Sequence, residues 1–272
     1  MRSDAKNRHK KVFIMRLLAI VFLPFLLLAA CENSAQNHKR QPREQNPSEK
    51  TVILVHGYAK DADDMQSLAG FLEKRGYRAI SVDLPLTFDH VNEAAEIFAK
   101  QMEEILSELP DNASVAMAGH STGGLVIRYF LAHSPDYKQV SHAVLIATPN
   151  QGSALADIAE DVSELLVETF ATLESLQPEN IPELGLSDPD ETRIGAIAGN
   201  KSTIALGRLL EKENDGRVEV ESVCYPGLDD FVVVPYHHNQ IHHRKETAEL
   251  VIRFLETGSF EKQPDPDTGS TN

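Results

Sequence analysis

The stretch that decides the fold is residues 115–130, VAMAGHSTGGLVIRYF. An apolar run typical of a buried strand passes into a helical pattern through the pentapeptide GHSTG, residues 119–123. A G-x-S-x-G turn between a strand and a helix holds its serine in strained backbone geometry, and a Cβ at either glycine would collide with the turn. Since the pentapeptide alone arises by chance in about one chain in twenty, the flanking strand and helix make the match specific. The stretch therefore predicts that Ser121 is a nucleophile.

Short apolar runs alternate with helical patterns on both sides of this turn. Runs typical of buried strands occupy residues 51–55, 79–82, 115–118, 143–147, 194–198 and 231–234. Helical stripes occupy residues 65–72, 94–109, 126–130 and 251–255, and are followed by Gly76, Pro110, Pro135 and Gly258. This alternation predicts an α/β fold around a mostly parallel sheet.

The composition is that of a globular, acidic protein. Of the 272 residues, 42% are hydrophobic and 25% are charged, which argues against a disordered chain, a collagen or a multi-span membrane protein. The 26 Lys and Arg residues against 41 Asp and Glu residues give a formal charge of −15, so we expect no nucleic-acid partner. Two cysteines, Cys31 and Cys224, permit at most one disulfide.

The first thirty residues are typical of a targeting segment. A basic start leads into the uncharged run Leu17–Ala30, which is shorter than the roughly 20 apolar residues that a membrane span needs. The tetrapeptide LAAC, residues 28–31, resembles the lipobox of bacterial lipoproteins. This resemblance implies that residues 1–30 are a signal peptide and that Cys31 is acylated after cleavage. The alternative is an uncleaved anchor with an incidental cysteine.

The segments on either side of the central domain are polar. Residues 31–50 contain two prolines and almost no apolar side chain, which predicts a flexible tether between a membrane and the domain. Residues 261–272 predict a disordered tail, which leaves residues 51–260 as one domain. With lipidated Cys31, this organisation predicts a protein of the bacterial cell envelope, anchored to a membrane and facing the periplasm. The lipoprotein resemblance implies that Glu32, in place of Asp, would permit outer-membrane delivery under the sorting rule of enteric bacteria.

The first predicted strand ends in Val55-His56-Gly57-Tyr58. An oxyanion hole needs two backbone N–H groups, one from the residue after the nucleophile and one from a loop after an earlier strand. Thr122 and Tyr58 fit those two positions. Since His56 precedes Ser121 in the chain, we expect it to hold this loop rather than to act as the base.

Several blocks together resemble the lipase/esterase branch of the α/β-hydrolase superfamily. They are VILVHGY (52–58), GHSTGGLVIR (119–128), ATPNQGS (147–153), and NDGRVEVES (214–222) with PGLDDFVVVPYHH (226–238). The resemblance covers essentially all of residues 51–260. It implies helices on both faces of the sheet, a Ser-Asp-His triad, no cofactor, and hydrolysis of carboxylic esters, often of lipids. Relatives usually carry a bulkier residue such as Met at Thr122, but only the backbone N–H of this residue is needed.

The same resemblance implies the chain order serine, acid, histidine for the triad. The base follows the last strand, and the family's proline two or three residues earlier favours His238 over His237. The acid follows the strand 194–198, where Asp215 matches the NDG block. Asp229 and Asp230 remain alternatives, although they look like turn residues before the last strand.

Two further patterns admit a chemical or a structural interpretation. The run His237-His238-x-x-x-His242-His243 would put His238 and His242 on one face of a helix. No Cys, Asp or Glu accompanies the run, so we expect no metal site. Asp83, after the second predicted strand, is expected to make structural hydrogen bonds.

Residues 153–191 fit the family pattern least. An apolar helical stripe ends near Phe170 and is followed by Pro178, Pro182 and Pro189. In α/β-hydrolases this position holds a small helical cap, which implies that Leu166 and Phe170 line an acyl pocket and set the preferred chain length. The alternative is an ordinary surface helix.

The residues together predict a membrane-anchored serine hydrolase that cleaves acyl or lipid esters through an acyl-enzyme on Ser121. His238 would transfer the proton, Asp215 would orient the imidazole, and the amides of Tyr58 and Thr122 would bind the oxyanion. The alternatives are an acyltransferase of the same fold and a catalytically idle binding module of the envelope.

Overall fold

The computed structural model describes residues 50–110, 113–154, 156, 171–202, 210 and 212–262. The predicted signal peptide, Cys31, the tether up to residue 49 and the tail from residue 263 lie outside the described residues. So do residues 157–170 of the predicted cap, including Leu166 and Phe170. Within the described ranges, no helix combines the length and the apolar character needed to span a membrane.

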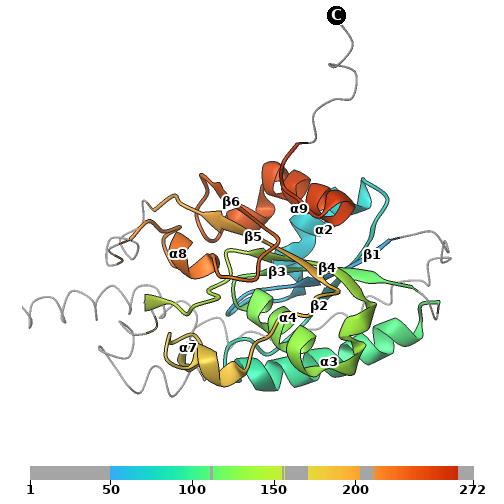
Figure 1. The fold of residues 1–272 in the computed structure, drawn as a ribbon, viewed down its shortest axis with the longest axis horizontal. Helices are drawn as coiled ribbons and strands as arrows, with labels where there is room; N and C mark the ends of the chain where they lie inside the picture. Colours follow the sequence, from blue (N-terminus) through green and yellow to red (C-terminus); the bar gives the residue numbers. More distant parts are fainter. Residues whose placement is uncertain are drawn as a thin grey trace, which may run out of the picture.

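One six-stranded sheet forms the centre of the domain (Figure 1). Its order is β2-β1-β3-β4-β5-β6, and every neighbouring pair is parallel. The strands are β1 (Thr51–Val55), β2 (Arg78–Val82), β3 (Val115–His120), β4 (Val140–Ile146), β5 (Arg193–Gly199) and β6 (Asp230–Val234). The predicted α/β fold is confirmed, and the ends of the strands differ from the prediction by at most three residues.

Helices cover both faces of the sheet, as Figure 1 shows with α2 and α9 on one side and α3 and α4 on the other. The long helices are α2 (Gln66–Glu73), α3 (Val91–Ser107), α4 (Thr122–His133) and α9 (Lys245–Thr257). Since both faces are covered, β1 and β3 are buried along their whole length and their sequences are nearly free of polar residues. Alternate side chains of a strand enter opposite layers of the core, as Ile53 and Leu54 do.

Shorter elements lie in the connections. They are η1 (Ala62–Met65), η2 (Pro135–Gln139), α7 (Ala171–Glu174), η3 (Ile181–Leu184), α8 (Val220–Val223) and η5 (Ile241–His243). The elements α7 and η3 fall in the predicted cap, of which the structure describes residues 153–154, 156 and 171–191.

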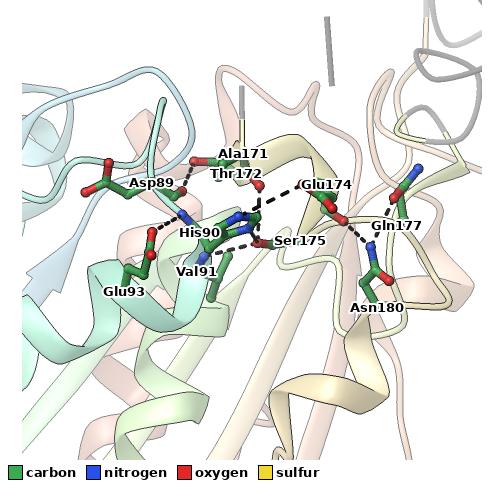
Figure 2. Close-up of polar contacts among 10 residues, drawn as sticks. All are labelled: Asp89, His90, Val91, Glu93, Ala171, Thr172, Glu174, Ser175, Gln177 and Asn180. Atoms are coloured by element: carbon green, nitrogen blue, oxygen red, sulfur yellow. Dashed lines mark hydrogen bonds and ion pairs between the residues drawn. The ribbon is translucent and has the colours of Figure 1, made fainter. Parts of the chain in front are cut away.

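The second half of the predicted cap docks on the start of α3 (Figure 2). Ser175 Oγ accepts a hydrogen bond from the N–H of Val91 at 3.1 Å, across 84 residues of chain. Thr172 Oγ1 donates to the carbonyl of Asp89 at 2.7 Å. The first N–H groups of a helix have no partner inside the helix. Ser175 therefore supplies an acceptor that the start of α3 lacks, and together with Thr172 it fixes this part of the predicted cap to the domain.

Candidate active site

The turn at Ser121 has the strained geometry that its glycines predict. Ser121 has φ 53° and ψ −126°, a conformation that L-residues rarely adopt. A Cβ on Gly119 would lie 2.7 Å from the carbonyl carbon of Gly123, and one on Gly123 would lie 2.5 Å from the oxygen of Val55. The N–H of Ser121 donates to Ile146 at 2.8 Å, so β4 also holds the turn. Only glycine fits both flanks.

Ser121, His238 and Asp215 form one hydrogen-bonded series at the carboxyl ends of the strands. His238 Nε2 lies 3.0 Å from Ser121 Oγ, across 117 residues of sequence. His238 Nδ1 lies 2.8 Å from Asp215 Oδ2. All three side chains are buried. The serine directly follows β3, whereas the acid and the histidine stand in the connections after β5 and β6, so the parallel sheet brings them together.

Backbone groups fix the orientation of the Asp215 carboxylate. Its Oδ1 accepts from the N–H groups of Arg217 at 3.0 Å and Val218 at 2.8 Å, which leaves Oδ2 for His238. The N–H of His238 donates in turn to the Asp215 carbonyl at 3.0 Å. Because an ionised carboxylate only accepts hydrogen bonds, the proton sits on His238 Nδ1. Nε2 is then free to accept the Ser121 proton.

The alternative acids serve the opposite end of the sheet. Asp229 accepts from the N–H of Ile194 at 2.6 Å, and Asp230 accepts from the N–H of Phe260 at 2.6 Å. Both contacts hold the amino ends of β5 and β6. Since His238 follows the carboxyl end of β6, neither carboxylate contacts it.

The two amides expected to bind an oxyanion flank Ser121. Thr122 is the first residue of α4, so its N–H has no acceptor within the helix. A Cβ on Gly57 would lie 3.0 Å from Ser121 Cβ, which shows that the loop carrying Tyr58 lies directly against the serine. Within the described part of the chain, the Tyr58 N–H donates to no acceptor.

His56 and Asp83 have the structural positions that the sequence predicts. His56 Nδ1–H donates to the carbonyl of Gly57 at 2.9 Å, and its Nε2 accepts from the N–H of Leu84 at 3.0 Å. Asp83 Oδ1 accepts from the N–H of Ala62 at 2.6 Å. Both side chains hold the loops after β1 and β2, and both ring nitrogens of His56 are used in doing so.

A second group of histidines lies behind His238 and was not anticipated from the sequence. His120 Nε2 is 3.1 Å from the carbonyl of His238. The ring of His242 stacks on His120 with centroids 3.7 Å apart, and His242 Nε2 is 2.9 Å from Asp64 Oδ2. The run of histidines was a signal for His242, but nothing in the sequence marked Asp64. The helical pairing of His238 with His242 does not occur, because η5 begins only after His238.

The geometry of this group does not fit a shared metal ion. Asp64, His120 and His242 each offer one ligand atom, and these atoms lie within 4.8 Å of one another. A zinc ion lies on the lone pair of each imidazole, about 2.0–2.1 Å from the nitrogen. The two rings are stacked with an interplanar angle of 23°, so their lone pairs do not converge on one point.

Burial keeps the two inner histidines neutral. It lowers the pKa of His120 well below the usual value, and the neighbouring His242 and His238 lower it further. Burial also lowers the pKa of His242, against the opposing effect of Asp64. Burial raises the pKa of Asp64, but the hydrogen bond from His242 and the nearby charges outweigh it and lower that pKa to about 2. At neutral pH the group therefore consists of two neutral imidazoles and one carboxylate.

A buried arginine on α4 was also missed by the sequence analysis. The guanidinium of Arg128 pairs with Asp188 at 3.2 Å and lies 3.9 Å from the centroid of the Tyr225 ring. Arg128 Nη1 donates to Asn150 Oδ1 at 3.4 Å. These contacts fasten three connections to α4, the helix that directly follows Ser121.

The start of the predicted cap contacts the loop that carries the acid. Ser153 Oγ donates to the carbonyl of Arg217 at 3.0 Å, two residues after Asp215. The first residues of the predicted cap therefore lie against the loop that holds Asp215. Whether Leu166 and Phe170 line a pocket concerns side chains outside the described residues.

Comparison with known proteins agrees with this architecture. The family model for palmitoyl protein thioesterase matches residues 51–182. The putative chloroplastic methylesterase 14 of Arabidopsis thaliana is 30% identical over 102 residues, which cover 36% of this chain and 29% of that protein. A triacylglycerol lipase of Pseudarthrobacter phenanthrenivorans is 30% identical over 119 residues, covering 41% and 36%. The chain thus spans about a third of the length of these relatives.

Solved structures extend the likeness to most of the chain. The mature form of the Bacillus licheniformis lipase BlEst2 superposes with a TM-score of 0.66 at 21% identity, over 80% of this chain and 96% of that structure. At this identity the likeness concerns the fold. The protein therefore has the α/β-hydrolase fold, and the proteins that it resembles are esterases and lipases.

Proposed function

We propose that the protein is a serine hydrolase that cleaves carboxylic esters of acyl chains through an acyl-enzyme on Ser121. The observation that carries this proposal is the continuous series from Ser121 Oγ to His238 at 3.0 Å and from His238 to Asp215 at 2.8 Å. It stands on a strained strand-to-helix turn, which is the arrangement of an activated nucleophile.

The reaction follows from these contacts. His238 Nε2 takes the Ser121 hydroxyl proton while Oγ bonds to the acyl carbonyl carbon, and the N–H groups of Tyr58 and Thr122 bind the resulting oxyanion. Collapse of this intermediate breaks the bond to the alcohol, which leaves with the proton from His238. A water molecule then gives its proton to His238 and attacks the acyl carbon. Release of the carboxylic acid returns the proton to Ser121.

The leaving group defines a second candidate substrate class. The match to the palmitoyl protein thioesterase model favours thioesters, whereas the lipase and methylesterase relatives favour oxygen esters. The same triad serves both classes, because the acyl-enzyme is identical and only the departing atom differs.

The proposal is tested by covalent labelling and by a substrate panel on the full-length protein. A fluorophosphonate probe is expected to add once to Ser121, as read by mass spectrometry, and Ser121→Ala is expected to take up no label. Matched oxygen esters and thioesters of increasing chain length, with product analysis, separate the two substrate classes. Transfer of the acyl group to an added alcohol in preference to water would identify an acyltransferase. An unlabelled wild type that cleaves nothing would identify a binding module and overturn the proposal.

We also propose that the hydrolase is held at a bacterial membrane through lipid on Cys31, within the cell envelope and facing the periplasm. The sequence pattern of a basic start, an uncharged run and LAAC supports this proposal. Two or more acyl chains on one residue give stable anchoring, and the polar residues that follow would let the domain reach a substrate beyond the membrane surface.

Replacing Cys31 with serine is expected to abolish incorporation of labelled palmitate and to leave an uncleaved precursor or release the protein from the membrane fraction. Cys224→Ser is the matched control, because this cysteine lies in the folded domain and is exposed. Its palmitate incorporation and fractionation should equal those of the wild type. A wild type that takes up no palmitate and fractionates as a soluble protein would refute the anchor while leaving the hydrolase proposal intact.

A further inference from the structure

The carbonyl of His238 has a buried hydrogen-bond partner that is not part of the proposed triad. Since a carbonyl only accepts, His120 Nε2–H is the donor in the 3.1 Å contact. His120 is 3% exposed, and its Nδ1 has no hydrogen-bond partner among the described residues. It is also the residue immediately before Ser121. One imidazole therefore ties the strand that carries the serine to the loop that carries the histidine.

His242 fixes that imidazole in turn. Its ring covers His120 at a centroid distance of 3.7 Å and an interplanar angle of 23°. His242 is 1% exposed, and its Nε2–H donates to Asp64 Oδ2 at 2.9 Å. Lys60 lies 3.4 Å from the other oxygen of this carboxylate. Lys60 thus contacts Asp64, and Asp64 binds the ring of His242. The His242 ring packs against one face of His120 and restricts its rotation.

We propose that Asp64 and His242 are positioning residues, which keep the His238 imidazole directed at Ser121 by holding His120 in the orientation that binds the His238 carbonyl. This inference rests on the proposed function, because it assigns the pair a part in the activity of that same site. Neither residue touches the reacting atoms. Their effect passes through one stacked ring and one hydrogen bond to the backbone of the base.

The arrangement predicts a loss of turnover rather than of substrate affinity. Without His242, the ring of His120 can rotate and its N–H leaves the His238 carbonyl. The imidazole of His238 then spends less time within hydrogen-bond distance of Ser121 Oγ. A misplacement of about 1 Å at a reacting group can lower the rate about 100-fold. Neither Asp64 nor His242 forms a hydrogen bond with Tyr58 or Thr122 within the described residues, so KM is expected to change little.

The test uses the full-length protein, assayed well below its unfolding temperature. His242→Ala is expected to lower kcat and the rate of fluorophosphonate labelling together, by about 10- to 100-fold, with KM within about twofold. Asp64→Ala is expected to lower both by about tenfold. Asp64→Asn should restore most of the rate because its amide oxygen still accepts from His242.

The matched control is His243→Ala. The ring centroids of His243 and His242 lie 3.9 Å apart, and His243 Nε2 lies 3.7 Å from Asp64 Oδ1. The side chain of His243 is 37% exposed. Its removal leaves the bond from His242 to Asp64 intact, so kcat is expected to fall by less than about twofold. This variant therefore measures the effect of removing an imidazole that contacts Asp64 and His242 but does not stack on His120.

A spectroscopic measurement distinguishes positioning from general destabilisation. The proton between His238 Nδ1 and Asp215 gives a strongly deshielded NMR signal when the imidazole is held in place. This signal should broaden or disappear in His242→Ala and persist in His243→Ala. A folded His242→Ala protein with wild-type kcat and an unchanged signal would overturn the inference.

Two further outcomes separate this inference from the proposed function. If His242→Ala fails to fold, Asp64→Ala replaces it, and wild-type kcat in that variant overturns the inference. If the wild type neither reacts with the probe nor cleaves an ester, the proposed function fails. The NMR signal then decides on its own whether the pair positions His238.

Discussion

Replacing His238 with alanine is expected to lower ester turnover about 10⁶-fold, the size of the loss that removal of the histidine causes in a serine-protease triad. The reason is the contact of its ring with the serine. Its Nε2 is placed 3.0 Å from Ser121 Oγ, and no other imidazole nitrogen is recorded at this hydroxyl among the described residues. Without it, no side chain at this position takes the proton of Ser121 as Oγ attacks.

The matched control for this prediction is the neighbouring residue. His237→Ala removes an equal ring one residue earlier and is expected to change kcat by only a few-fold, because among the described residues it is His238 whose ring nitrogen lies at Ser121 Oγ. Steady-state hydrolysis by both purified variants, with circular dichroism to show that each is folded, makes the comparison. The assignment of the base is wrong if His237→Ala is the inactive variant and His238→Ala retains turnover.

Replacing Asp215 with asparagine is expected to lower turnover about 10⁴-fold with the fold intact. The backbone N–H groups of Arg217 and Val218 would still bind the amide oxygen at the Oδ1 position. The amide NH₂ would then face His238 and act as a donor where the carboxylate accepts. The imidazole must turn its lone pair toward the amide, so its proton moves to Nε2 and blocks transfer from Ser121. The loss should therefore appear in kcat and in probe labelling.

Asp230→Asn is the control for this substitution. Asp230 accepts from the N–H of Phe260 and from Ser259 Oγ at the amino end of β6, so its loss affects stability. Its turnover should fall far less than that of Asp215→Asn, while its unfolding temperature falls. An inactive Asp230→Asn protein beside an active Asp215→Asn protein would show that the acid is misassigned.

The sequence predicts those parts of the fold that depend on a local pattern of residues. The strands β1 and β3 were predictable because both of their faces are buried, which leaves an unbroken apolar run. The turn at Ser121 was predictable because only glycine fits its flanks. The pairing of Asp215 with His238 followed from chain order and resemblance. Catalytic roles for these residues remain a prediction for the experiments above.

The contacts that the sequence did not reveal are those between distant segments. The start of α3 depends on Ser175, which lies 84 residues away. The bond between Asp64 and His242 spans 178 residues. No periodicity marks such pairs, because each residue has an ordinary local setting and acquires its partner only when the sheet forms. The side chains that support a site from distant segments therefore cannot be predicted from the sequence until the topology is known.

Under the proposed function, the strand order also sets when Ser121 can react during synthesis. The strands that surround the turn at Ser121, which are β1, β3 and β4, all lie before residue 147. Its acid and base follow β5 and β6, and β6 is an edge strand that joins the sheet last along the chain. A polypeptide that ends before these residues therefore lacks the proposed acid and base of Ser121. Under the proposed function, hydrolysis would require the last quarter of the chain, so it would report that β6 and the loop after it have folded.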